Sequence, residues 1–358
     1  MMTDFLDLEA EAARLRARFP KPLKDAGRIV LYGAGFLGSW VVGWLKSQGI
    51  TPVALIDGDA RKHGESIDGV EILDFAALDS LRPDLVLITA RHAVGPVTDR
   101  LERSGHLGVS LDAWYVADQL DRFRDCFAQL TDTRSRETLH AVLTAMLTGQ
   151  RAHLFSVFEQ NQYFCLPRFC GVEREAYVDA GAYVGDSIER FIWANAGVFS
   201  TIHAFEPAAR QFAALTTRRD RLVQEWALEP GQIRLNQAGL SSGSGRMSAS
   251  SASGLLQSVA LQTSADGEIP AISLDAYLEG DRVSLIKADV EGMELPLLAG
   301  AAETIRRHQP KLAICVYHYP SDIPDIMAAI RSLVPEYRFS LRHHSPQLME
   351  TVLYAWVE

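Results

Sequence analysis

The sequence of 358 residues predicts an α/β protein with two Rossmann-like domains joined by a helical connector. Two apolar runs each lead into a glycine turn, at residues 33–38 and 181–185. In both cases a second apolar run follows and ends in an acid, first Asp57 and later Glu206. This is the order of a nucleotide-binding β-α-β unit. We therefore expect a first domain at residues 1–112, a connector at 113–162 and a second domain at 163–358.

The first domain begins with an amphipathic helix, after which residues 28–32 form a buried-strand run. Further strand-like runs are at 52–56, 70–73 and 84–89. Four residues form a candidate nucleotide site, namely Gly33, Gly35, Gly38 and Asp57. The expected ligand is NAD or a nucleotide sugar, and Asp57 favours an unphosphorylated ribose. Because this fold persists where binding has been lost, a purely structural unit is the alternative.

The connector is predicted from apolar residues at helical spacing in the sequences YVADQLDRFRDCFAQL and ETLHAVLTAMLTGQ. Low-complexity sequence does not occur here, which favours a rigid junction.

The glycine turn of the second domain has a distinctive acidic character. Residues 176–187 read AYVDAGAYVGDS, so Asp179 and Asp186 flank Gly181 and Gly185. Carboxylates repel phosphate and suit a ligand with a positive centre and an amino group, which describes S-adenosylmethionine. Glu206 can accept hydrogen bonds from a ribose diol. The alternatives are a turn-forming role for Asp179 and a solvated strand end for Glu206.

Seven strands are expected in this domain, near residues 176–179, 201–205, 233–236, 284–289, 311–317, 337–341 and 350–357. The last two have no room for a helix between them, so they should pair antiparallel. Residues 236–254, which are rich in Ser and Gly, read as a flexible loop.

The succession YVDAGAYVGDS, AFEP, SLDAYL and LIKADVEGME resembles the FkbM-type S-adenosylmethionine-dependent methyltransferases, from about Gln162 to the end of the chain. The resemblance implies a seven-stranded methyltransferase sheet with an antiparallel last strand, and O-methylation of a sugar, glycan or secondary metabolite. The motifs VLYGAGFLG, ALIDGD and GVEIL resemble nucleotide- or sugar-binding units found beside sugar acyltransferases and some FkbM-type enzymes. The cofactor residues expected are Asp179, Gly181, Tyr183, Gly185, Asp186, Ser187, Glu206, Asn236 and Gln237, with Ser253 a weaker candidate.

The catalytic candidates are Asp289, Glu291 and His318, because Asp289 and His318 end apolar runs, where strand ends open onto a ligand crevice. They can act as a general base with its orienting partner or hold Mg²⁺ or Mn²⁺. The alternatives are helix capping by the two acids and a structural histidine. Lys287 is expected on the opposite face if the run alternates strictly, and the alternative is that it too reaches the crevice near the strand end.

The aromatic residues Tyr163, Phe164 and Phe169 precede the first strand of this domain and form either an acceptor platform or core. We also expect Glu206→Ala to weaken cofactor binding while thermal stability stays near wild type.

Composition limits the partners. A net charge of −10 and a pI near 5.5 argue against nucleic acid as substrate. Eighteen consecutive apolar residues do not occur, so no membrane span is expected, and the four cysteines match no zinc pattern. We expect a cytoplasmic enzyme with a small-molecule or glycan acceptor, and a homo-oligomer stays open. The alternative function is a NAD- or nucleotide-sugar-binding module, an oxidoreductase or scaffold, with an inactive methyltransferase-like domain.

Overall fold

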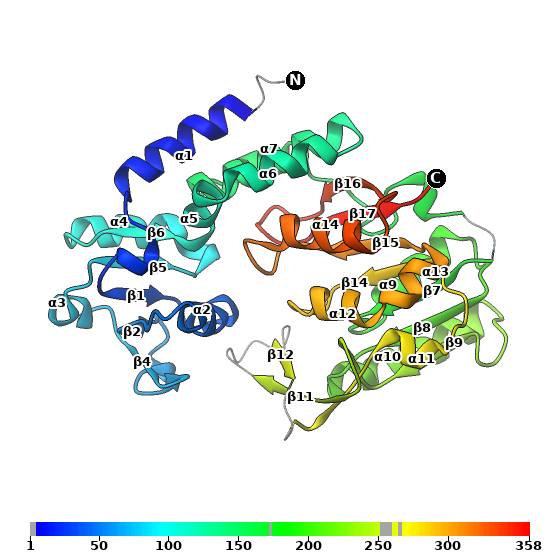
Figure 1. Ribbon diagram of the computed structural model, residues 1–358. Helices are drawn as coiled ribbons and strands as arrows, with labels where there is room; N and C mark the ends of the chain where they lie inside the picture. The colour runs from blue at the N-terminus through cyan, green and yellow to red at the C-terminus, as the bar shows by residue number, and fades with distance from the viewer. Residues whose placement is uncertain (1–4, 172–173, 251–259, 264–266) are drawn as a thin grey trace.

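The computed structural model describes residues 5–171, 174–250, 260–263 and 267–358. Its two larger sheets, of six and seven strands, lie on opposite sides of the molecule (Figure 1). Several helices of the middle of the chain run above both of them in this view. None of the helices in the described residues is long and apolar enough to cross a membrane.

The N-terminal sheet has the strand order β3-β4-β2-β1-β5-β6. Its strands are β1 (Ile29–Tyr32), β2 (Ala54–Ile56), β3 (Ser66–Ile67), β4 (Val70–Leu73), β5 (Leu85–Ile88) and β6 (Gly108–Ser110). All neighbours are parallel except β3 and β4. The alternating side chains Val30 and Leu31 enter two different cores, on the two faces of the sheet. The covering helices are α2 (Phe36–Ser47), α3 (Ala77–Leu81) and α4 (Val94–Arg103).

The middle of the chain is helical, as predicted. It contains α5 (Leu111–Asp118), α6 (Leu120–Gln129), α7 (Thr133–Thr148) and α8 (Ala152–Phe155). Asp132 caps α7 by accepting the Ser135 N–H at 2.8 Å, and Gly149 ends it with φ of +71°. The leading helix α1 (Leu6–Arg18) packs against α5 and α7, and its Leu8 lies in the same core as helix α7.

The C-terminal sheet has the order β16-β17-β15-β14-β7-β8-β9. The strands are β7 (Ala176–Ala180), β8 (Thr201–Phe205), β9 (Ile233–Asn236), β14 (Leu285–Ala288), β15 (Lys311–Cys315), β16 (Arg338–His343) and β17 (Thr351–Trp356). Strand β17 is antiparallel to both of its neighbours, and the other pairs are parallel. This confirms the seven strands and the antiparallel end, which are consistent with a methyltransferase fold.

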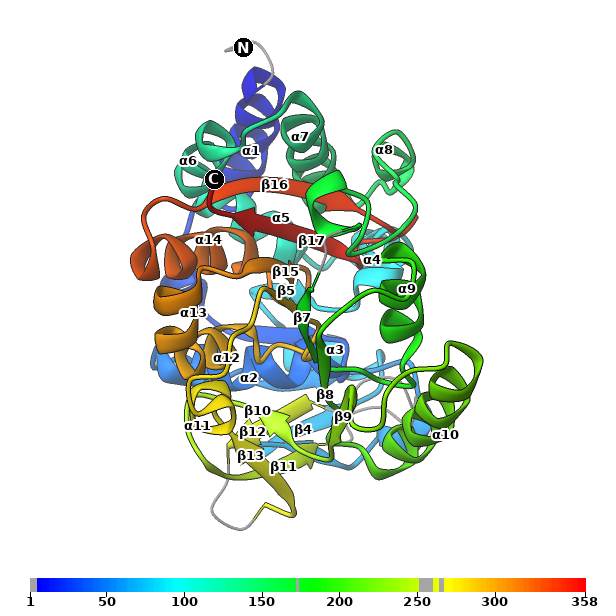
Figure 2. The same cartoon turned by 90° about the vertical axis from the view of Figure 1, so that its right-hand side faces the viewer.

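Helices cover both faces of the C-terminal sheet. On one face lie α9 (Asp186–Ala194) and α10 (Ala209–Glu225), which share a core with Tyr177. On the other lie α12 (Glu294–Gly300), α13 (Ala302–His308) and α14 (Asp322–Leu333), which share a core with Val178. Figure 2 shows α7 lying over β16 and β17, so the helical middle of the chain closes this end of the sheet.

The prediction of a flexible loop at residues 236–254 is wrong for residues 236–250, the part that the structure describes. A third sheet of four strands, in the order β10-β13-β11-β12, contains β10 (Gly239–Leu240), β11 (Gly245–Ser250), β12 (Ala260–Thr263) and β13 (Ile269–Ile272). Met247 of β11 is fully buried in the main core, so the one large apolar side chain of this strand anchors it. Helix α11 (Leu274–Leu278) follows, capped by Ser273. Ser253 lies outside the described residues.

Candidate active site

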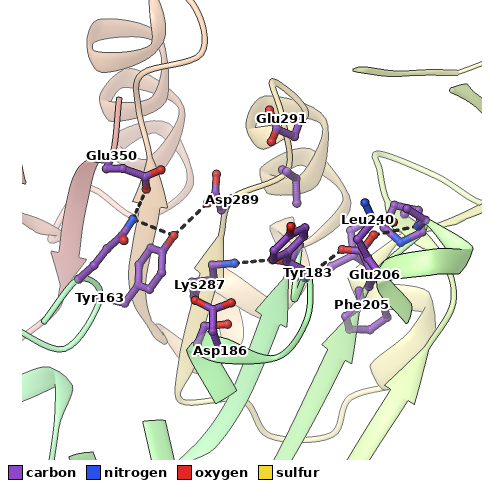
Figure 3. Close-up of a pocket in the computed structure, with 18 of the residues that line it drawn as sticks. Tyr163, Tyr183, Asp186, Phe205, Glu206, Leu240, Lys287, Asp289, Glu291 and Glu350 are labelled. Atoms are coloured by element: carbon purple, nitrogen blue, oxygen red, sulfur yellow. Dashed lines mark hydrogen bonds between the residues drawn. The ribbon is translucent and has the colours of Figure 1, made fainter. Parts of the chain in front are cut away.

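A cavity of about 350 Å³ lies at the carboxyl ends of β7, β8, β14 and β15. It runs from Glu206 and Leu240 at one end, past Tyr183 and Lys287, to Asp289 and Glu350 at the other (Figure 3). Its position agrees with the rule that ligands bind where parallel strands end.

The turn after β7 requires its glycines. Gly181 has φ of +74°, and a Cβ there would lie 1.8 Å from the carbonyl oxygen of Asp289. Gly185 has φ of +83°, and a Cβ would lie 2.8 Å from Leu215 Cδ1. Gly181 therefore lets the end of β7 lie directly against the end of β14, and Gly185 lets the turn pass close to α10.

Glu206 is held by the turn that it faces. Its carboxylate accepts the Tyr183 N–H at 2.9 Å and the Ala208 N–H at 2.8 Å, one at each oxygen. The residue is 6% exposed, and this burial raises the pKa of its carboxyl group. Because each carboxylate oxygen has a second lone pair, Glu206 keeps acceptor capacity toward the cavity that it lines.

A buried ion pair supports the middle of the cavity. Lys287 Nζ lies 3.1 Å from Asp179 Oδ1 and donates to the carbonyl oxygen of Gly181 at 2.6 Å. Burial lowers the pKa of Lys287, but Asp179 more than offsets this and leaves it raised. Asp179 also accepts a hydrogen bond from Ser187 and lies beneath the lining residues.

Lys287 lines the cavity together with Asp289, which is the second of the two alternatives. The expectation that it lies on the opposite face was wrong, because residues two positions apart along a strand share a face.

The far end of the cavity is built around Asp289. Its two oxygens accept hydrogen bonds from Tyr163 and Tyr317, each at 3.0 Å. Burial alone raises the pKa of Asp289, but Lys287, His318 and the two tyrosine hydroxyls together hold it below its usual value.

Glu350 also lines this end and accepts a hydrogen bond from Gln162. Burial first and Asp289 second raise the pKa of Glu350 to about 7.

His318 lies behind Asp289 among three carboxylates. Its Nδ1 is 3.2 Å from Glu294 Oε1, while Nε2 is 3.5 Å from Glu291 Oε2 and 3.6 Å from Asp289 Oδ1. Burial lowers the pKa of His318, but Glu294 and Glu291 raise it well above its usual value. The predicted trio of Asp289, Glu291 and His318 does come together, with Glu294 as an additional member.

Most predicted cofactor residues lie at the cavity. Its lining includes Gly181, Tyr183, Asp186, Ser187 and Glu206, whereas Gly185 shapes the turn from behind. Asn236 and Gln237 are not among the described lining residues. The Asn236 amide instead donates to Ala204 O and Tyr277 OH, both at 3.2 Å, and Gln237 is exposed.

The sequence also left several lining residues unassigned. Lys287, Tyr317 and Glu350 were missed, and Glu294 behind them was missed as well. Of the three aromatic candidates Tyr163 lines the cavity, while Phe164 and Phe169 lie in the core.

Residues 179–341 match the model of the methyltransferase FkbM domain. The chain is also similar to the crystal structure of methyltransferase FkbM from Methylobacillus flagellatus KT, with a TM-score of 0.61 and 24% identity over 99% of this chain and 100% of that one. At this identity the likeness shows a shared fold. No curated protein matches the chain.

Two further solved structures are more distant. An rRNA methylase from Streptococcus thermophilus has a TM-score of 0.33 and 14% identity, over 52% of this chain and 89% of that chain. Fibrillarin from Aeropyrum pernix, solved with natively bound S-adenosyl-L-methionine, has a TM-score of 0.34 and 12% identity, over 56% and 72%. Neither is similar enough to support a conclusion about this chain.

The match to the FkbM domain model, at residues 179–341, does not reach the N-terminal glycine turn. Gly33 there has φ of +114°, and a Cβ on Gly38 would lie 1.9 Å from the Gly33 carbonyl oxygen. Gly35 has open space where a Cβ would be. Asp57 accepts the Ala34 N–H at 2.8 Å and lies 3.1 Å from Lys62 Nζ, so its carboxylate is already engaged. Nucleotide binding by this turn stays a prediction.

Proposed function

We propose that the protein is an S-adenosylmethionine-dependent O-methyltransferase that acts on a hydroxyl of a sugar, glycan or secondary metabolite. The FkbM domain match supports a methyltransferase. The single observation that carries the proposal is that one cavity is lined by both Glu206 and Asp289. Glu206 can accept hydrogen bonds from the ribose of the cofactor, and Asp289 can activate a substrate hydroxyl. The division into domains at residues 112 and 162 belongs to the same proposal.

The residues present fit S-adenosylmethionine. Glu206 has spare lone pairs for a ribose diol, and Gly181 leaves the backbone of the turn bare beside it. Among the described lining residues Lys287 is the single Lys or Arg and is paired with Asp179, while Asp186, Glu206, Asp289, Glu291 and Glu350 are acidic. This negative lining suits a sulfonium ligand. Bound S-adenosylmethionine supplies an electrophilic methyl group.

Asp289 is the residue we assign to the acceptor. Its side chain is 22% exposed and lines the cavity, and Tyr163 and Tyr317 fix its orientation from either side. A hydroxyl seated against it can pass its proton to the carboxylate as the oxygen takes the methyl group. The tyrosine hydroxyls hold the rotamer so that little reorganisation is needed.

The acceptor is expected to be neutral or cationic. Asp289, Glu291 and Glu350 line the same end of the cavity, and their combined charge repels phosphate or carboxylate groups. Hydroxyl groups can instead donate hydrogen bonds to these oxygens. A free polyol or amino sugar therefore suits this end better than a sugar phosphate.

The first experiment is calorimetry of the full chain with S-adenosylmethionine, followed by transfer of labelled methyl to a panel of sugars and glycans. We expect binding by wild type and by Asp289→Asn, but transfer by wild type alone. Glu225→Gln, on the exposed side of α10, is the matched control and should bind and transfer normally. Failure of wild type to bind S-adenosylmethionine would refute the proposal.

A second candidate function is binding of NAD or a nucleotide sugar at the N-terminal turn. The positive φ of Gly33, the bare Gly35 and the helix α2 that starts behind them favour it. Lys62, which lies 3.1 Å from Asp57, would have to move for a ribose to reach that carboxylate. The same calorimetry with NAD and UDP-sugars tests it, and binding lost in Asp57→Asn would assign the site.

A further inference from the structure

The strongest unexplained feature of the molecule is the cluster of carboxylates around His318. This residue is 4% exposed, and Glu294 beside it is 2% exposed. Among the described residues neither ring nitrogen of His318 makes a hydrogen bond of acceptable geometry, although carboxylate oxygens lie 3.2 Å from Nδ1 and 3.5 and 3.6 Å from Nε2. A buried polar group without a good partner is uncommon and calls for an explanation.

Carboxylates outnumber the basic groups in this cluster. Asp289, Glu291 and Glu294 all lie within 3.6 Å of the one imidazole. Lys287 and Arg91 are the nearby basic groups, and they form close ion pairs with Asp179 and Asp112. Even when His318 carries a proton, three carboxylates face one imidazolium, and buried charge in excess of its counter-charge costs several kcal/mol, so a further cation is favoured at this place.

The geometry fits a metal ion. One ligand atom from each of Asp289, Glu294 and His318 lies within 4.8 Å of the others. Ligands of one tetrahedral Zn²⁺ ion lie about 2.0–2.2 Å from it and hence about 3.4 Å from each other, so the side chains would move by about 1 Å to close the site. Glu291, whose side chain is 32% exposed, lies 3.5 Å from the imidazole and can complete the coordination.

We propose that Asp289, Glu294 and His318, assisted by Glu291, bind one divalent first-row transition ion such as Mn²⁺ or Zn²⁺. Zn²⁺ accepts both imidazole and carboxylate ligands, and Mn²⁺ is suited to carboxylates, so one nitrogen with several oxygens fits either ion. Mg²⁺, which prefers all-oxygen coordination, should bind more weakly.

This site lies directly behind the proposed acceptor position. Asp289 Oδ1 accepts the Tyr317 hydroxyl and is the oxygen nearest His318, whereas Oδ2 accepts the Tyr163 hydroxyl. The two oxygens thus allow Asp289 to face the ion and the cavity at once. Binding of the ion does not depend on the proposed methyl transfer, and only its role in activating the acceptor rests on that function.

The test is a titration of the metal-stripped full chain with Mn²⁺. Electron paramagnetic resonance measures binding, because the signal of free Mn²⁺ decreases as the ion binds. We expect one bound Mn²⁺ per chain, displaced by Zn²⁺ and weakly by Mg²⁺. Asp289→Asn and Glu294→Gln should each weaken binding at least tenfold. Glu175→Gln is the control, because Glu175 is a buried carboxylate paired with Lys311, outside the cluster. It should bind Mn²⁺ as wild type does.

Two results would overturn the site: no binding of Mn²⁺ or Zn²⁺ by the folded wild type, or undiminished binding by folded Asp289→Asn. If Glu294→Gln does not fold, Asp289→Asn decides, since that side chain is partly exposed. Methyl transfer by a chain that binds no metal would refute the metal site and leave the enzyme function intact. Metal binding by a wild-type chain that does not bind S-adenosylmethionine would refute the enzyme function and leave the metal site intact.

Discussion

Replacement of Glu206 by Gln tests the cofactor end of the cavity and the stability of its turn together. The carboxylate accepts one backbone N–H at each oxygen, from Tyr183 and Ala208. An amide offers only one oxygen, so in Glu206→Gln one of these N–H groups would face an NH₂ group. Since Glu206 is 6% exposed, water replaces the lost acceptor poorly.

The expected effect on stability is about 1–3 kcal/mol, the cost of one buried unsatisfied donor. Glu206→Ala removes both acceptors and should cost more. The two backbone bonds therefore change the expectation, drawn from the sequence, that Glu206→Ala would leave thermal stability near wild type.

The expected effect on cofactor binding follows from the same count of acceptors. A ribose diol donates two hydrogen bonds to the carboxylate, and the amide can accept one. Loss of one charge-assisted bond, about 1.5–3 kcal/mol, corresponds to roughly 10- to 150-fold weaker binding of S-adenosylmethionine. Denaturant unfolding and calorimetry measure the two effects separately, with the surface variant Glu225→Gln as control.

Unchanged affinity of a folded Glu206→Gln protein would refute ribose binding at this carboxylate. Unchanged stability would show instead that the turn finds other acceptors for the Tyr183 and Ala208 N–H groups.

Three further perturbations test the remaining parts of the site and fold. Gly181→Ala places a Cβ 1.8 Å from a backbone oxygen and should abolish cofactor binding in calorimetry, whereas Gly64→Ala, with φ of +83° and open space, adds only local strain. Asp289→Asn should lower methyl-transfer turnover by at least 100-fold with cofactor affinity within threefold, and equal losses of both would contradict its acceptor role. Burial lowers the pKa of His203 to about 4, from an unfolded value near 6.5, so the neutral ring contributes stability above pH 6.5 that is lost toward pH 4. The stability advantage of wild type over His203→Gln in urea unfolding should therefore shrink by about 1.4 kcal/mol per pH unit across that window, and a constant difference would contradict the assignment.

The main elements of the fold could be predicted because they are long and regular. Every strand of the C-terminal sheet lies where an apolar run predicts one, and the antiparallel end follows from the short connection between β16 and β17. The missed strands are short or poor in large side chains. Strand β6 has three residues and begins with Gly108, and β11 has a single large apolar residue, Met247. Their pairing depends on tertiary contacts that periodicity does not report.

The site was predictable where a motif and a strand end coincide, as at Gly181 and Asp289. It was not predictable where convergence depends on which strands are neighbours. Tyr163 reaches Asp289 across 126 residues of sequence, and Gln162 reaches Glu350 across 188. Glu294 lies only a few residues after Asp289 and Glu291 in the sequence. Its side chain lies close to His318 because of the turn into α12, in which Glu291 has φ of +53°.

The segment of residues 1–112 contributes to this site, although none of its described residues lines the cavity. Arg91, which follows β5, binds Asp112 through two nitrogens and donates to the carbonyl oxygens of Tyr317 and His318. Trp40 of α2 stacks on Tyr319 with ring centroids 4.4 Å apart. The backbone that presents the Tyr317 hydroxyl and the His318 ring is therefore fixed from the other half of the molecule. Because these contacts come from segments far apart in sequence, residues 179–341 alone would lack the support that orients the acceptor end of the site, whatever the N-terminal glycine turn binds.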